Sequence, residues 1–303
     1  MKLRRAAIER GLLPKEIYKG ASYFVTELAL FLSDQIRNEL RILLSRLLKE
    51  AGVTEDGTFF RIDAYIDPEM RHLNIIEVNS HFVDGWGVAL NLARAAGWRV
   101  ALPTGVFPKF WTLTDNVYLP ELELACQELE LLAGEKHDVV FWGEALGLQQ
   151  PVYWYGRFRR EGFLQVVPKC GALLDDKIWL ARVAREWSPN RVLVPKCYSV
   201  EETPWENLPT DVVLKVRRKW ENERAKPVFR AELVSGKGTR KAYQRGELIA
   251  QEVVSTLHID DRPIQAVIMC AGIEPVVGYI QHAHHKARFI NDNSEHGPLL
   301  FGG

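Results

Sequence analysis

The stretch that decides the fold runs from Phe59 to Asn79 and reads FFRIDAYI (59–66), DPEMRH (67–72) and LNIIEVN (73–79). Its outer segments alternate in polarity, and the middle segment has the proline and charged residues of a turn, so it predicts a β-hairpin. Successive side chains of a strand point to opposite faces. With the apolar faces packed on a core, four polar side chains share the other face: Arg61, Asp63, Glu77 and Asn79.

These four side chains suit a magnesium site, because two carboxylates and an amide oxygen are hard ligands that leave positions for water or phosphate. Arg61 would balance the carboxylates without metal and hold a phosphate oxygen with it. The same side chains could instead form a solvated outer face, which is common in antiparallel sheets. A Gly-flanked turn, DGWG (84–87), follows and opens an apolar helix whose N-terminal amides suit an anion, which favours the metal interpretation.

The composition limits the class of protein. The chain has 303 residues, of which 47% are hydrophobic, and this predicts a sizeable core divided into two or three lobes. Its 39 Lys and Arg balance 39 Asp and Glu, which argues against a nucleic-acid or membrane-surface partner. The four cysteines are far apart and are typical of reduced thiols, so we expect a cytoplasmic protein.

Apolar periodicity predicts the other elements. One long helix is expected over 27–52, ending at Gly52. A strand, a short helix and a strand over 138–142, 151–162 and 163–168 suggest a small parallel α/β lobe. The remaining expectations are helices at 88–97, 120–134 and 175–187, strands at 212–216, 227–234 and 247–254, and a hairpin of 263–269 with 275–281 before a polar tail.

The motif FRID (60–63), with Glu77 of IIEVNS 14 residues after Asp63 and a helix beyond, resembles the metal-binding end of the ATP-grasp fold. Its early place in the chain resembles the circularly permuted ATP-grasp group that includes the synthetase part of glutathionylspermidine synthase. The resemblance covers about residues 50–303. It implies an α/β fold of α+β lobes, a circularly permuted ATP-grasp fold with a small pre-ATP-grasp-like α/β lobe.

The resemblance also implies a division into four parts. Residues 1–105 would hold an N-terminal helix and the metal-binding part of the large lobe. Residues 106–176 would form the small pre-ATP-grasp-like lobe, and 177–255 the nucleotide-binding lid lobe. Residues 256–303 would complete the large lobe.

Individual residues match the family pattern. Lys177 in DDKIWLARV and Lys215 in DVVLKV match its two nucleotide lysines. SGKGTRK (235–241) resembles its phosphate-covering glycine loop. Gln251 and Glu252 in LIAQEVV resemble the hinge that meets adenine and ribose. The resemblance further implies Asp63, Glu77 and Asn79 as metal ligands and Arg61 as the catalytic cation, with Arg288 or Asn291 facing the site.

The cofactors implied are ATP and Mg²⁺, and the activity is that of an ADP-forming carboxylate–amine ligase that works through an acyl phosphate. Its partners would be a small-molecule or peptide carboxylate and an amine acceptor. A kinase on the same fold and a binding module without turnover remain alternatives. Lys215 is followed by VRRKWENERAK, which lacks the family's proline and glycines and favours the binding module. The basic stretch 215–241 could be a nucleic-acid arm, a lid over a triphosphate or a flexible loop without a ligand.

Overall fold

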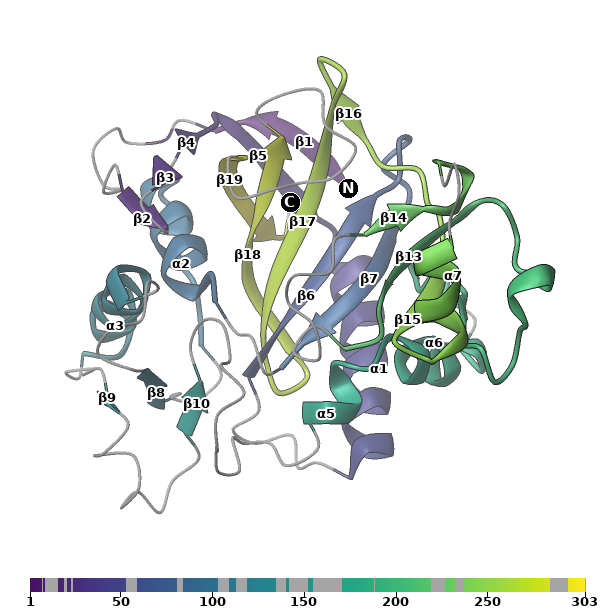
Figure 1. Ribbon diagram of the computed structural model, residues 1–303. Coiled ribbons are helices and arrows are strands. Elements are labelled where there is room, and N and C mark those ends of the chain that lie inside the picture. Colours follow the sequence, from purple (N-terminus) through teal and green to yellow (C-terminus); the bar gives the residue numbers. More distant parts are fainter. Residues whose placement is uncertain are drawn as a thin grey trace.

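The computed structural model of the chain describes residues 1–6, 8, 16–18, 21–22, 24–52, 59–80, 84–102, 109–112, 119–134, 140–141, 152–154, 171–187, 189–218, 227–232, 237–283 and 294–302. These residues form a mixed α/β fold built around a curled ten-stranded sheet (Figure 1).

The large sheet runs in the order β1–β5–β19–β18–β17–β6–β7–β11, with β4 paired to β19 and β16 paired to β17. Its strands are β1 (Lys2–Arg5), β4 (Phe24–Val25), β5 (Leu28–Leu32), β6 (Phe59–Ile66), β7 (Leu73–Asn79), β11 (Val192–Leu193), β16 (His258–Ile259), β17 (Arg262–Ala271), β18 (Glu274–Ala283) and β19 (Ser294–Phe301). The pairs β19–β5, β19–β4 and β11–β7 are parallel and the others are antiparallel. Strands from both ends of the chain thus meet in one sheet.

Two layers of helix cover the two faces of this sheet. Helix α1 (Asp34–Ala51) packs on one face, against Ile62 and Ile268, in the main hydrophobic core. Helix α2 (Trp86–Ala95) packs on the other face, in a core with Val267 and Met269, and α3 (Leu119–Ala133) packs on α2.

Helix α1 confirms the predicted apolar stripe, but its start was predicted wrongly. The stripe consists of six residues at helical spacing, all buried: Ile36, Leu40, Leu43, Leu44, Leu47 and Leu48. Ser33 caps the N-terminus, and Gly52 ends the helix with a φ of 69°. Such a left-handed conformation favours glycine. Residues 28–32, expected to be helical, are instead β5, because this apolar run pairs with β1 and β19 before the helix begins after Ser33.

The expected polar tail is also wrong over 294–301, because β19 lies in the interior of the large sheet between β18 and β5. Its Leu299 is fully buried. At Gly297 a Cβ atom would clash with the Leu28 carbonyl oxygen, so this strand approaches the neighbouring backbone too closely for any other residue.

A second sheet of four strands, in the order β12–β15–β13–β14, follows in the second half of the chain (Figure 1). Its strands are β12 (Cys197–Tyr198), β13 (Val212–Val216), β14 (Val228–Phe229) and β15 (Leu248–Glu252). The helices around it are α6 (Lys177–Arg185), η1 (Trp205–Asn207), η3 (Arg230–Glu232) and α7 (Lys237–Gln244). We call this sheet the small sheet.

The remaining elements include the predicted small parallel unit. Strands β8 (Lys109–Thr112), β9 (Val140–Phe141) and β10 (Val152–Trp154) form a parallel sheet in the order β10–β8–β9. Residues 152–154, expected to be helical, are therefore a strand, and the strand expected at 163–168 lies outside the described residues. The other elements are β2 (Glu16–Tyr18), β3 (Ala21–Ser22) and α5 (Gly171–Leu174). Among the described helices, none combines the length and apolarity needed to cross a membrane.

Candidate active site

The hairpin of β6 and β7 brings the four predicted polar side chains together. Its register pairs Asp63 with Glu77 and Arg61 with Asn79, so all four share one face. A bulge between Asp63 and Ala64 lies next to this group. The opposite face carries Ile62 and Ala64, both fully buried in the core with α1. The apolar face thus fixes the register that collects the polar group.

Arg61 is held by two buried carboxylates. Its Nε and a terminal nitrogen donate to the two oxygens of Asp63, at 2.9 and 3.0 Å. Its other terminal nitrogen donates to Asp84, which the sequence interpretation missed. Burial alone would lower the pKa of Arg61, but Asp63 and Asp84 outweigh it and hold this pKa well above the ordinary value. Arg61 is therefore a permanent cation beside Asp63.

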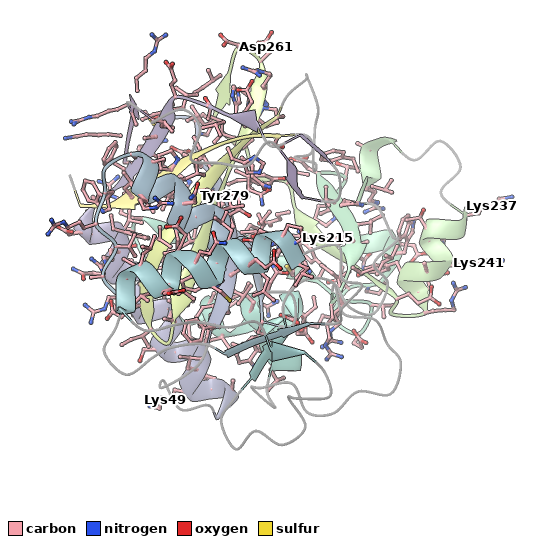
Figure 2. All side chains as sticks on the ribbon, turned by 90° about the vertical axis from the view of Figure 1, so that its left-hand side faces the viewer. Lys49, Lys215, Lys237, Lys241, Asp261 and Tyr279 are labelled. Carbon is pink, nitrogen blue, oxygen red and sulfur yellow. The ribbon has the colours of Figure 1, made fainter. Side chains whose placement is uncertain are left out.

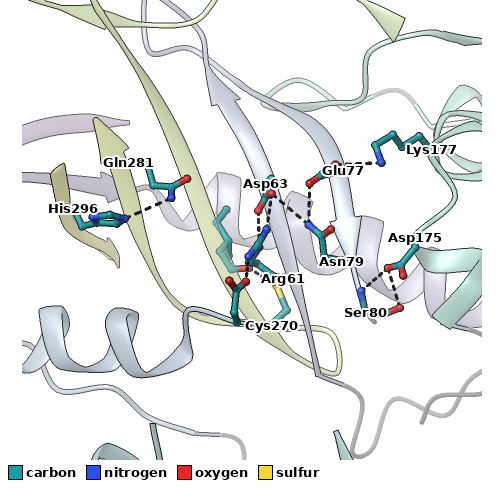
Figure 3. A network of polar contacts seen from close by, with 12 residues as sticks. Arg61, Asp63, Glu77, Asn79, Ser80, Asp175, Lys177, Cys270, Gln281 and His296 are labelled. Atoms are coloured by element: carbon teal, nitrogen blue, oxygen red, sulfur yellow. Dashed lines mark hydrogen bonds and ion pairs between the residues drawn. The ribbon is translucent and has the colours of Figure 1, made fainter. Parts of the chain in front are cut away.

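Glu77 and Asn79 complete the group (Figure 3). The Asn79 amide nitrogen donates to Asp63 and to Glu77, at 3.3 Å each. Lys177 comes from the first turn of α6, and its Nζ lies 3.2 Å from a Glu77 oxygen. Lys177 is only 3% exposed. The structure thus joins the hairpin to a lysine that is 100 residues further along the chain.

The two residues before Lys177 fix its position. Asp175 accepts hydrogen bonds from the backbone and hydroxyl of Ser80, which follows Asn79 (Figure 3). Asp176 caps α6 by accepting from the Ile178 and Trp179 amides. The sequence interpretation missed both roles, although an acidic residue directly before a helix is a signal for an N-cap.

Asp176 also reaches the small sheet. It forms ion pairs with Arg217 at 2.8 Å and Arg218 at 2.9 Å, which directly follow β13. Although burial opposes it, the hydrogen bond from Arg217 holds the pKa of Asp176 below its ordinary value. The arginines where the chain departs from the family pattern are thus tied to the residue beside Lys177.

Lys215 of β13 also belongs to this group. Its pKa is lowered to about 8, first by burial and then by the charge of Lys177, while Glu77 and Asp63 act in the opposite direction. Lys215 is partly exposed, and it lies near the middle of the view in Figure 2. The two predicted nucleotide lysines therefore lie in one electrostatic environment with the hairpin carboxylates.

Gln251 and Glu252, at the end of β15, lie at the junction of the two sheets. The Gln251 amide nitrogen donates to the Ile76 carbonyl oxygen of β7 at 3.2 Å. The Glu252 carboxylate accepts from the Tyr198 hydroxyl at 3.0 Å and from the Lys196 backbone at 3.3 Å. Gln251 thus joins the small sheet to the hairpin, whereas Glu252 is bonded within the small sheet.

The predicted glycine loop is wrong for residues 237–241, which form the exposed first turn of α7. In Figure 2, Lys237 and Lys241 lie at the outer edge of the molecule, away from Lys215. Tyr243 of the same helix is fully buried in the small-sheet core, which explains why the segment is helical. Ser235, Gly236, Arg288 and Asn291 lie outside the described residues.

The place expected for an anion at the N-terminus of α2 is taken by a carboxyl group of the chain itself. Glu121 of α3 accepts hydrogen bonds from the Gly87 and Val88 amides at 2.7 and 3.2 Å. Burial and, secondarily, Asp84 raise its pKa to about 8. These amides are therefore already bonded and are not available to a phosphate.

The donor set at the hairpin fits a hard divalent cation. Asp63 and Glu77 face each other, and their present partners are cations and an amide. A metal between them would require Asn79 to present its amide oxygen instead of its nitrogen. Within the described part of the chain, no cluster of three or more His, Cys, Asp or Glu side chains is arranged for a metal. Asp63, Glu77 and Asn79 would fill only part of the coordination sphere of Mg²⁺, and phosphate or water oxygens would supply its other ligands.

No family model matches the sequence, and no curated protein matches it. Several solved structures do match, among them one described as "Putative gamma-glutamylcysteine synthetase" from Methylobacillus flagellatus KT. That match has 12% sequence identity and a TM-score of 0.43, and covers 87% of this chain and 84% of the other. At these values the similarity assigns neither a family nor an activity to the chain.

Proposed function

We propose that the protein is an ADP-forming carboxylate–amine ligase that uses Mg²⁺ and ATP, on a circularly permuted ATP-grasp fold. The observation that carries the proposal is the ion pair of Lys177 with Glu77, beside Asp63 and Lys215. Two carboxylates on one hairpin face and two ammonium groups from later elements form the charge pattern that a metal-bound triphosphate requires.

Each residue has a distinct part in this proposal. Asp63, Glu77 and Asn79 would hold Mg²⁺, which when bound offsets the charge of the phosphate oxygens. Lys177 and Lys215 would bind phosphate oxygens as point charges. Arg61 would turn from Asp63 toward the transferring phosphoryl group, while Asp84 retains the other side of its guanidinium. Gln251 and Glu252 would border the nucleotide base and ribose.

The proposed reaction has two steps. A carboxylate oxygen of the acid attacks the γ-phosphorus of ATP, and the bond to the β-phosphate oxygen breaks, which gives an acyl phosphate and ADP. The amine then attacks the acyl carbon, phosphate leaves, and the amine loses a proton. Both steps depend on positioning and charge stabilisation, so no protein nucleophile is needed.

The test is ADP release with Mg²⁺ and ATP over a panel of carboxylic acids, with hydroxylamine as the acceptor. An activated carboxylate is trapped by hydroxylamine as a hydroxamate. We expect ADP and hydroxamate in equal amounts from at least one acid, and neither product from Asp63→Asn. Asp261→Asn, at an exposed turn far from the site (Figure 2), is the matched control and should retain activity.

Two outcomes would contradict the proposal. ADP release without hydroxamate, together with a phosphorylated hydroxyl compound, would identify a kinase. Absence of ADP with every acid, while Mg²⁺-dependent nucleotide binding persists, would identify a binding module.

A further inference from the structure

Four polar side chains form a row across the large sheet, next to the candidate active site. Tyr65 of β6 pairs with Gln265 of β17, Gln265 pairs with Gln281 of β18, and Gln281 pairs with His296 of β19. Paired residues of antiparallel strands point to the same face. Tyr65 is two residues after Asp63, so the row lies on the face of the metal-binding group. We call Tyr65, Gln265, Gln281 and His296 the polar row.

The polar row begins just beyond the part of the sheet face that α2 covers. Along β17 and β18, Met269, Val267, Val277 and Tyr279 share this face and pack in the core with α2 and α3. The next position on each strand is a glutamine. On the opposite face of the same strands, Ala266 and Ile280 are fully buried under α1. The change to amides is therefore confined to one face and to one level of the sheet.

The row offers hydrogen-bond donors and acceptors without a permanent charge. The Gln281 amide nitrogen and the His296 Nε2 atom lie 3.5 Å apart, on the same side of the sheet as Asp63 (Figure 3). Tyr65 and Gln281 are partly exposed, and Gln265 and His296 are buried. Amides in such a setting need polar partners, because burying them unpaired is costly.

The composition of the row defines which ligand it can bind. It has no Lys or Arg, so it offers no fixed positive charge to a second carboxylate or a phosphate. It also lacks the apolar surface that an alkyl chain requires. Amide and hydroxyl groups, which donate and accept at once, match it. Three strand spacings separate Tyr65 from His296, roughly 14 Å, or about four residues of extended chain.

We propose that the polar row binds the body of the acid substrate, an uncharged chain that carries amide or hydroxyl groups, with its reacting carboxylate beside Asp63 and Glu77. The inference rests on the proposed ligase function and adds the substrate class. Tyr65 is the link between the two regions, since it lies two residues after Asp63 on the same face of β6 and pairs with Gln265. A peptide-like and a sugar-like acid share this chemistry.

The experiment uses four acids in the hydroxamate assay: N-acetyldiglycine, lactobionate, octanoate and citrate. We expect hydroxamate from N-acetyldiglycine, from lactobionate, or from both, and these two results distinguish amide from hydroxyl recognition. In Gln281→Leu, the KM for the accepted acid should rise at least tenfold while the KM for ATP stays the same. Gln35→Leu, at an exposed position of α1 on the other side of the sheet, is the matched control and should change neither KM.

Each result decides one of the two claims. Hydroxamate only from octanoate or citrate overturns the polar-row assignment and leaves the ligase function standing. Equal rises in both KM values in Gln281→Leu also overturn it, because a structural defect would act on both substrates. If no acid gives hydroxamate, neither these four nor any other acid of the wider panel, the ligase function and the subsite are both overturned. If Gln281→Leu does not fold, Gln281→Glu keeps the size of the side chain and should give the same split in KM.

Discussion

At the scale of single residues, the candidate active site is a compact set of opposite charges. Asp63 is bonded to Arg61, Glu77 is bonded to Lys177, and Lys215 lies in the field of all of them. Buried charges persist only when they are paired in this way. A bound metal and triphosphate would replace these partners charge for charge, with the metal opposite the carboxylates and the phosphates opposite the ammonium groups.

Lys215 should give nucleotide binding a pH dependence. Its pKa of about 8 means that it is largely protonated at pH 7 and largely neutral at pH 9. If only the ammonium form binds phosphate, the affinity for Mg²⁺ and the analogue AMPPCP should fall about tenfold over this range. Calorimetric titration at several pH values measures the fall. Lys215→Met should bind weakly at pH 7 and lose the pH dependence.

Lys237→Met is the control for this prediction, because Lys237 is exposed on α7 and far from Lys215 (Figure 2). It should reproduce the wild-type curve, including the contribution from ionisation of the analogue itself. An unchanged pH dependence in Lys215→Met would remove Lys215 from the site.

Single-residue patterns predicted the face shared by the hairpin side chains, but they did not predict the charges that complete it. The alternation of FFRIDAYI and LNIIEVN is a local property, so the shared face followed from strand geometry alone. Asp84 and Asp175 contact Arg61 and Ser80 across 23 and 95 residues. Nothing local to either aspartate indicates such a partner, because the contact depends on how distant elements pack.

At the scale of elements, the start of α6 connects three parts of the fold. Asp175 bonds to the end of β7, Asp176 caps α6 and pairs with Arg217 after β13, and Lys177 reaches Glu77. Three consecutive side chains therefore link the hairpin, the helix and the small sheet. This arrangement explains how residues far apart in the sequence keep their places around one site.

Substitutions at Asp176 should separate its two roles. Asp176→Asn keeps an oxygen for the Ile178 and Trp179 amides but loses the charge that binds Arg217 and Arg218. Asp176→Ala loses both, so it should be less stable than Asp176→Asn by about 1 kcal/mol, the usual contribution of an N-cap. Urea unfolding followed by circular dichroism measures the difference. Equal stability of the two variants would show that Asp176 does not act as a cap.

Glu121 should make the packing of α2 on α3 depend on pH. Its pKa is raised from 4.5 to about 8 in the folded protein, so the folded state binds a proton that the unfolded state has released. This contribution to stability is complete below about pH 4.5 and is lost as the pH rises toward about 8. Glu121→Gln mimics the protonated form. The free energy of unfolding of Glu121→Gln should therefore exceed that of wild type, and the difference should grow by up to about 1.4 kcal/mol for each pH unit between about 4.5 and about 8.

The matched control is Glu123→Gln, because Glu123 is exposed on the same helix. Thermal unfolding from pH 4 to pH 8 should show the growing advantage for Glu121→Gln and none for Glu123→Gln. An advantage that stays constant with pH would mean that Glu121 is ionised in the folded protein.

The sequence predicted helices and strands correctly where an element has one apolar and one solvated face. It failed where pairing with distant strands determines the secondary structure. The stripe of α1 is visible in the sequence because its opposite side is solvated. The run LALFL (28–32) is equally compatible with helix and strand, and only its pairing with β1 and β19 settles the choice. SGKGTRK (235–241) was expected to be a phosphate loop because of its glycines, yet burial of Tyr243 holds residues 237–244 as a helix.

At the scale of the whole molecule, the two sheets meet at the candidate active site. The Gln251 amide donates to β7, the charges of Lys215 and Glu77 act on each other, and the Asp176 ion pairs tie the small sheet to α6. The order of the large sheet places β19 and β5 side by side, although one is near each end of the chain. Sequence periodicity does not contain such long-range order, so the polar row across β17, β18 and β19 could not be predicted.

The central claim is that Asp63 and Glu77 hold a metal ion on a triphosphate that Lys177 and Lys215 also bind. A crystal structure with Mn²⁺ and AMPPCP tests it most directly, because anomalous scattering locates the manganese independently of the phasing. We expect one manganese site about 2 Å from oxygens of Asp63 and Glu77, with phosphate oxygens next to both lysines. A nucleotide or metal bound elsewhere, with the Arg61–Asp63 and Lys177–Glu77 ion pairs still in place, would contradict the account.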